Sequence, residues 1–307
     1  PASAGFPRNE IITSLWMEGE RICGCLQETA MVCKSYKGGF KQMLYGGMNS
    51  PIKPVLEEVE AIAKLGFDYL ELAMDSPQAH YKMVNQQKDD ILSALERYNM
   101  GLVCHLPAFV STADLTDSLR ETSLNEVLES LQVAAHLQTL KVVLHPSYIS
   151  GLSVLVMDQA RDRAWRSLEA VVEKADQLGV SICLENMFPA TNSLVEPEHF
   201  VPVFESFPSL KMTLDTGHAH MQSKGSKRAL HFIERFGTRI DHIHANDNFG
   251  KEDNHLPIGA GTVDFPRITK ALKKIGYDGT ITLEVFSRDR DYLKISREKL
   301  AAMFAAP

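Results

Sequence analysis

Long apolar runs, an excess of positive charge and a nucleotide-binding glycine motif are all missing from this sequence. No stretch approaches the ~18 apolar residues of a membrane-spanning helix, and the N-terminal segment lacks the apolar core of a secretory signal. With 32 Lys and Arg against 39 Asp and Glu, the formal net charge is −7. No basic field therefore indicates a nucleic-acid partner, although a local basic groove is compatible with this total. We expect a cytoplasmic protein without a membrane partner.

Cysteine is scarce, and its spacing shows no paired C-x-x-C motif. The five residues are Cys23, Cys25, Cys33, Cys104 and Cys183. This pattern excludes a disulfide framework and a cysteine zinc site, and the two that lie in apolar runs, Cys104 and Cys183, are expected to be buried thiols. The other three fall in residues 1–42, which show no regular strand or helix pattern. We interpret residues 1–42 as an extension of unclear role and residues 43–307 as the functional domain.

A repeating unit organises the remainder of the chain. A helix-period segment is followed by a glycine and then by a short apolar run that ends in a polar residue. Between Trp165 and Leu178 the apolar residues fall at helical spacing, Gly179 supplies a left-handed cap, and the strand VSICLE follows. The segment from Phe265 to Gly276, followed by TITLEVF, repeats this order.

Eight such strands can be counted, each followed by a segment able to form a helix. They are MLYGG, FDYLEL, LVCHL, LKVVLH, VSICLE, LKMTLD, RIDHIHA and TITLEV. Apolar strands alternating with helices indicate a parallel sheet covered on both faces, and eight units predict a closed (β/α)8 TIM barrel in one domain. An open doubly wound sheet is the alternative, but no G-x-G-x-x-G follows the first strand, and no Pro/Gly/Ser-rich linker interrupts the units.

The residues that close these strands are unusual. Six consecutive strands end in a side chain of a metal-ligand type: His105, His145, Glu185, Asp215, His244 and Glu284. Because the carboxyl ends of the strands form the active face of a barrel, we expect all six to converge at its mouth. Carboxylates and imidazoles together suit Zn, Mn, Co or Mg. The sequence therefore predicts a divalent-metal site.

The loops that follow the strands offer further candidates. His218 lies three residues after Asp215, and Asp253 and His255 lie in the loop after the seventh strand. Glu71, after the second strand, is expected to contact substrate, whereas His242 is expected one layer deeper in the barrel, in a hydrogen-bonded role. The glycines of PIGAGT either bind a phosphate through backbone amides or only fold their loop.

The motifs LEN, LDTGH, HANDN, DNHLPIGAG and TLEV make the chain, from Met43 onward, resemble the xylose isomerase-like barrel superfamily. That superfamily includes sugar epimerases and endonuclease IV, a zinc enzyme that cuts DNA at abasic sites. The resemblance to the epimerases implies that Glu185, Asp215, His244 and Glu284 bind one divalent metal. It also implies that Glu185 and Glu284 are the catalytic acid and base and that His218 contacts substrate oxygens. We also expect His255 to contact substrate.

The resemblance to endonuclease IV implies a different site, which holds three zinc ions on nine side chains. By motif position these are His105, His145, Glu185, Asp215, His218, His244, Asp253, His255 and Glu284. Four departures oppose this reading: LENM replaces a longer glycine-containing segment, LDTGHAH lacks the family's cysteine, the loop between His244 and Asp253 is short, and GGMNS lacks the Arg and aromatic residues of a DNA-inserting loop.

Three functions follow from these observations. The first is a metal-dependent isomerase or epimerase that acts on a small sugar, sugar phosphate or polyol ketone through an enediolate. The alternative is a zinc-dependent phosphodiesterase that acts at abasic sites in DNA, and the third reading is a barrel that binds a sugar without catalysis. One to three metal ions per chain are compatible with these readings, as is a homo-oligomer.

Overall fold

The structure is a computed structural model that describes residues 43–306. The prediction of an extension over residues 1–42, with Cys23, Cys25 and Cys33, lies outside the described residues.

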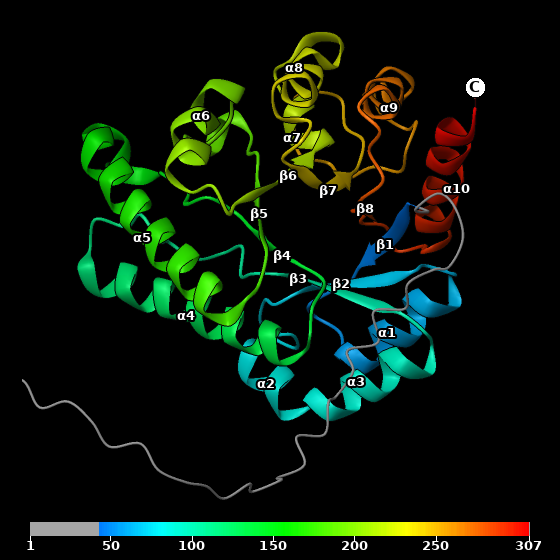
Figure 1. Cartoon of the computed structure of the whole chain (residues 1–307), viewed down its shortest axis with the longest axis horizontal. Coiled ribbons are helices and arrows are strands. Elements are labelled where there is room, and N and C mark those ends of the chain that lie inside the picture. The colour runs from blue at the N-terminus through cyan, green and yellow to red at the C-terminus, as the bar shows by residue number, and fades with distance from the viewer. Residues whose placement is uncertain (1–42, 307) are drawn as a thin grey trace, which may run out of the picture. The chain divides into compact units, whose positions relative to one another are not determined.

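Eight parallel strands close into a barrel in the order β1 to β8, with β1 paired to β8 (Figure 1). Their bounds are β1 Leu44–Met48, β2 Tyr69–Ala73, β3 Gly101–His105, β4 Val142–Leu144, β5 Ile182–Glu185, β6 Lys211–Asp215, β7 Ile240–Ala245 and β8 Thr280–Leu283. The predicted (β/α)8 barrel and its eight strands are confirmed, and the open doubly wound alternative is wrong.

Helices surround this barrel on its outer face (Figure 1). Their bounds are α1 Val55–Lys64, α2 Tyr81–Gln86, α3 Lys88–Arg97, α4 Asp117–His136, α5 Met157–Leu178, α6 Pro197–Ser206, α7 Thr216–His220, α8 Lys227–Phe236, α9 Phe265–Lys274 and α10 Asp291–Ala305, with short 3-10 turns at η1 Gly151–Val156, η2 Pro189–Thr191 and η3 Lys224–Ser226. Within residues 43–306, no helix combines the length and apolar character needed to span a membrane.

The helix ends follow the predicted signals. Gly179 ends α5 with φ 67° and Gly276 follows α9 with φ 71°, the left-handed conformation that glycine adopts at little cost. At the start of α9, the Asp264 carboxylate accepts a hydrogen bond from the Arg267 N–H and satisfies a free amide of the first turn. These caps set the points at which the chain turns back into the next strand.

The main core lies between the strands and the helices, and a smaller apolar cluster fills the barrel interior. Tyr69, Val103 and Val143 form this inner cluster and are fully buried. A Cβ at Gly46 would lie 2.1 Å from the Tyr69 ring, so only glycine leaves room for this ring. Cys104 and Cys183 are buried free thiols, as predicted. The packed interior leaves the carboxyl ends of the strands as the place for a site.

Candidate metal centre at the carboxyl ends of the strands

The closed barrel brings the six strand-end residues to one end. His105, Glu185 and Asp215 are the last residues of β3, β5 and β6, and His244 lies near the end of β7. The other two, His145 and Glu284, directly follow β4 and β8. The expected convergence is therefore present, while the role of each residue as a ligand stays a prediction.

Glu185 lies at the centre of this group, and four imidazoles approach its carboxylate. Oε1 is 3.1 Å from His218 Nδ1 and 3.4 Å from His244 Nδ1. Oε2 is 3.2 Å from His145 Nε2 and 3.6 Å from His105 Nε2. The carboxylate is fully buried. Such a position requires strong compensation, because a buried charge without partners is costly.

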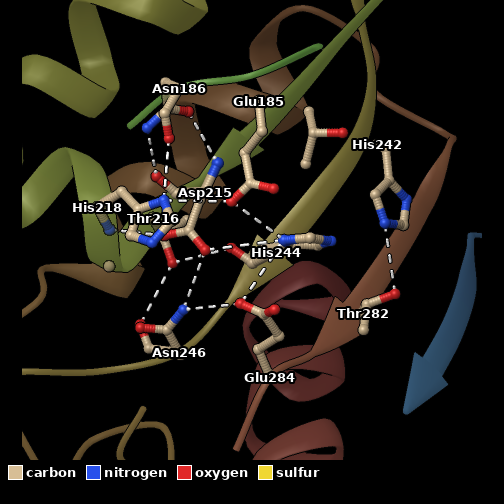
Figure 2. Close-up of polar contacts among 12 residues, drawn as sticks. Glu185, Asn186, Asp215, Thr216, His218, His242, His244, Asn246, Thr282 and Glu284 are labelled. Atoms are coloured by element: carbon tan, nitrogen blue, oxygen red, sulfur yellow. Dashed lines mark hydrogen bonds and ion pairs between the residues drawn. The ribbon is translucent and has the colours of Figure 1, made fainter. Parts of the chain in front are cut away.

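Carboxylates also approach the His244 ring from three strands (Figure 2). His244 Nδ1 lies 3.4 Å from Glu185, 3.8 Å from Asp215 and 3.6 Å from Glu284. The Asn246 amide donates to Asp215 Oδ2 at 3.1 Å and reaches Glu284 Oε2 at 3.5 Å. The Asp215 Oδ1 atom accepts the His218 backbone N–H at 2.6 Å and so caps α7. The carboxylates of Asp215 and Glu284 are thus oriented by Asn246.

The donor atoms of this group fit a divalent cation. Both carboxylate oxygens of Glu185 and the Nδ1 atom of His244 are buried and make no hydrogen bond within residues 43–306. Buried polar atoms are nearly always satisfied, so these atoms, which face one another without a hydrogen-bond partner, are suitable ligands for a cation. Groups of carboxylate and imidazole donors within 4.8 Å of one another include Asp215, His244 and Glu284. This donor set suits zinc or manganese.

The three predicted loop residues form a second cluster beside the first. Asp253 Oδ2 lies 3.2 Å from His218 Nε2 and 3.0 Å from His255 Nε2, and Asp253 Oδ1 is buried without a partner in the described chain. The ring of His255 stacks on Phe286 with centroids 4.4 Å apart. The structure therefore brings all nine predicted metal-site residues together.

Glu71 is not where the sequence analysis placed it. It lies inside β2 rather than after it, and it is fully buried beneath the mouth. Its Oε1 lies 2.9 Å from His244 Nε2, and its Oε2 lies 2.9 Å from His242 Nε2 and also contacts the Thr282 hydroxyl. Parity along β2 directs this side chain into the barrel, and the expected substrate contact stays a prediction. The deeper, hydrogen-bonded position predicted for His242 is confirmed.

An ionised carboxylate only accepts hydrogen bonds, so Glu71 requires a proton on the Nε2 atom of His244. Nδ1 is then the atom that faces Glu185, Asp215 and Glu284, and a metal bound there would displace its proton. Carboxylate partners of this kind commonly orient histidines that bind metals. Glu71 is therefore a positioning residue for His244. The sequence analysis named Glu71 but missed this role, although Glu71 lies two residues after the buried Tyr69 and so has the same parity in β2.

Asp247 is a second residue that sequence reasoning missed. Its buried carboxylate accepts the backbone N–H groups of Asn248, Gly259 and Val263 at 2.9, 2.9 and 3.0 Å. The amide of Gly259 within PIGAGT and that of Val263, directly after it, are therefore engaged in folding the loop, which favours the second of the two readings of these glycines. The sequence signal that could have revealed it is the acidic position of the HANDN motif, which is Asp247 itself.

The carboxylates differ in their protonation behaviour. Burial raises the pKa of Glu185, but the surrounding histidines, His244 first, outweigh it and hold this pKa well below its usual range. Burial raises the pKa of Asp215 to about 7; nearby His218 opposes the rise, and the negative charge of Glu284 adds to it. Low polarity and the proximity of like charges both disfavour the ionised form of Asp215 and so raise its pKa.

Two histidines of the site, His244 and His255, have raised pKa values. Burial lowers the pKa of His244, but Glu71 and Glu284 outweigh it and hold this pKa well above the usual range. For His255 burial is likewise outweighed, by Asp253 and Glu284, and the pKa rises to about 9. The negative charge at this end of the barrel therefore attracts cations, protons included.

Comparisons with known proteins agree with this architecture. The family model described as xylose isomerase-like TIM barrel matches residues 59–305. An uncharacterised protein of Methanocaldococcus jannaschii is 31% identical over 79% of this chain and 86% of its own length. The L-ribulose-5-phosphate 3-epimerase UlaE of Escherichia coli is 23% identical over 82% and 93%. A crystal structure of a D-tagatose 3-epimerase-like protein is 27% identical, covers 86% of this chain and 97% of its own, and superposes with a TM-score of 0.76.

Proposed function

The chain belongs to the xylose isomerase-like TIM barrel family, and from this premise we propose that it is a divalent-metal-dependent isomerase or epimerase. Its substrate is a small sugar, sugar phosphate or polyol ketone. The observation that carries the proposal is the placement of Glu185 and Glu284, both of which approach His244 Nδ1, within 3.4 and 3.6 Å, from different strands. The sugar epimerases among the relatives support it.

Glu185, Asp215, His244 and Glu284 would hold the metal in this proposal. A bound divalent ion supplies Lewis-acid polarisation of a carbonyl and its neighbouring hydroxyl. The protein groups prepare this place: Glu71 directs His244, and Asn246 fixes the carboxylates of Asp215 and Glu284. Three carboxylates and one neutral imidazole form a suitable donor set for Mn, Co, Mg or Zn.

The two glutamates carry the proton transfer. One carboxylate removes the proton from the substrate carbon beside the carbonyl; the C–H bond breaks, and its electron pair enters the enediolate. Return of a proton from the opposite face by the other glutamate, after it has taken one up from solvent, inverts that carbon, whereas return to the neighbouring carbon isomerises the sugar. His218 and His255 border the two glutamates and are the proposed contacts for substrate hydroxyls.

Proton exchange with solvent tests this function directly. D-Tagatose and L-ribulose 5-phosphate would be incubated with the metal-loaded protein in D2O and followed by NMR. We expect deuterium at the carbon beside the carbonyl with the wild type and none above background with Glu284→Gln, because the amide cannot take up the proton. Equal metal content in both proteins is the control. Exchange by Glu284→Gln at the wild-type rate would refute the assignment.

A second candidate function is favoured by the cluster of His218, Asp253 and His255. A one-metal epimerase does not need this cluster as metal ligands, whereas a zinc phosphodiesterase acting at abasic sites uses several metals to generate hydroxide and neutralise the leaving oxygen. Elemental analysis of protein purified without chelator separates the two. One metal ion per chain supports the epimerase; three zinc ions, together with salt-dependent binding of an abasic duplex, support the nuclease.

A further inference from the structure

A large cavity lies beside the metal centre, between β4 and the helices α4, α5 and α6, and its volume is about 450 Å³. Its wall includes Leu144 and Val171 from the core side and Ala164 and Trp165 from α5. This volume lies in the range of small-molecule sites. Of the residues that line this cavity, only His145 also belongs to the metal centre described above.

His145 connects this cavity to the metal centre. Its ring lines the cavity, while its Nε2 atom lies 3.2 Å from Glu185 Oε2. On the other side of the ring, Nδ1 lies 3.2 Å from the hydroxyl of Tyr148, which also lines the cavity. A molecule held at the metal centre is therefore separated from the cavity by little more than this imidazole.

The polar groups of the lining are already satisfied by one another. The Thr112 and Ser147 hydroxyls lie 2.6 Å apart, Ser167 donates to the Thr112 carbonyl, and the Asn192 amide donates to the Ile149 carbonyl. The ionisable side chains Arg161 and His199 are exposed. The mainly apolar inner wall consequently offers few hydrogen bonds to a sugar hydroxyl, and burying such a hydroxyl against it would be unfavourable.

We propose that this cavity binds an apolar substituent of the substrate, an aromatic ring or a short acyl chain, while the sugar part lies at the metal centre. The substrate class is thus a sugar or polyol derivative rather than a free ketose. An apolar cavity of about 150 Å³ is large enough for benzene, so the volume here accommodates a substituted ring. This inference rests on the proposed function for the position of the sugar part.

Direct binding tests the inference without turnover. The probes are the 1-O-benzyl and 6-O-benzyl ethers of D-fructose and the matching methyl ethers, titrated calorimetrically into protein purified with its metal. We expect at least one benzyl ether to bind about ten- to a hundredfold more tightly than its methyl counterpart, the gain that burial of a ring of this size provides. Equal affinities in both pairs would overturn the proposal.

Filling the cavity supplies the structural control. Ala164→Phe places a ring inside it, and Ala170→Phe makes the same change on α5 at a residue outside the lining. We expect the benzyl preference to disappear in the first variant and to persist in the second. If Ala164→Phe does not fold, Ser193→Phe narrows the cavity from the loop after β5. A benzyl preference that survives in a folded cavity-filling variant would place the ring elsewhere and reject the proposal.

The two proposals fail separately. A benzyl preference that depends on the cavity, without proton exchange on any ketose, would reject the isomerase function and retain the apolar site. Proton exchange on free ketoses, with equal binding of benzyl and methyl ethers, would retain the isomerase function and reject the apolar site.

Discussion

Replacement of Glu71 by glutamine should weaken metal binding although Glu71 does not point into the metal centre. The two carboxylate oxygens face the Nε2 atoms of His244 and His242 at 2.9 Å each. Glutamine keeps the volume but offers one acceptor and one NH2 donor. Whenever the NH2 group faces His244, that imidazole must accept at Nε2 and carry its proton at Nδ1, where a metal would otherwise bind.

The expected size of the effect follows from this tautomer change and from the lost negative charge. Removing the hydrogen-bonded partner of a metal-binding histidine typically lowers metal affinity about 10- to 100-fold, or about 1.4–2.8 kcal/mol. We expect Glu71→Gln to fall in this range while the barrel remains folded, because the Thr282 hydroxyl can still donate to the amide oxygen. A loss of metal affinity in this range would indicate that Glu71 orients His244 and does not itself bind the metal.

Zinc affinity would be measured by competition with a chromogenic chelator, on metal-stripped wild type and variant. Glu58→Gln is the matched control, since Glu58 is also a buried carboxylate but pairs with Arg290 and the Ser50 N–H. We expect its zinc affinity to stay within about twofold of the wild type. Wild-type zinc affinity in Glu71→Gln would refute the positioning role.

Other perturbations have equally definite outcomes. Because the pKa of His255 is raised to about 9, its stabilising proton is fully held below pH 6.5 and lost as pH rises through 9. A divalent ion held by Glu284, whose Oε2 lies 3.6 Å from His255 Nδ1, would repel this proton. The Tm difference between zinc-loaded and chelator-treated protein should therefore widen from pH 6.5 to 9; a constant difference would contradict this. Gly217→Ala should lower the free energy of unfolding by about 1–3 kcal/mol in urea titrations, since its Cβ would lie 1.9 Å from Asn246 Oδ1. Asp247→Asn should cost about 2 kcal/mol in the same assay, because one amide oxygen replaces a carboxylate that accepts three N–H groups; an unchanged midpoint would refute that reading.

The sequence predicted the barrel because its signals are local and repeated. The caps at Gly179 and Gly276 mark where each helix turns into a strand, and the closing residue of each strand is set by spacing alone. Closure then places Asp215 opposite His244 in the register of β6 and β7 without further information. Residues that act at the end of a strand were therefore accessible to pattern reading.

Residues that act across the barrel were not accessible in this way. Glu71 contacts His244 over a separation of 173 residues. Whether its side chain points into or out of the barrel depends on its parity in β2, and the sequence does not fix the residue at which β2 ends. The role of Asp247 depends on how a long loop folds back on itself. The cavity beside His145 arises from the packing of three helices, which periodicity does not measure. Each of these needs coordinates in three dimensions.

Asp247 anchors the loop after β7, and this anchoring stiffens one part of the rim of the barrel. An antiparallel bridge between Asp247 and Leu256, together with the three amides on its carboxylate, fixes this wall at both ends. Amide protons held in this way exchange with solvent only when the loop opens, so Gly259 and Val263 belong to the slow-exchanging part of the chain. We therefore expect the loop after β7 to keep its shape when a ligand enters this end of the barrel.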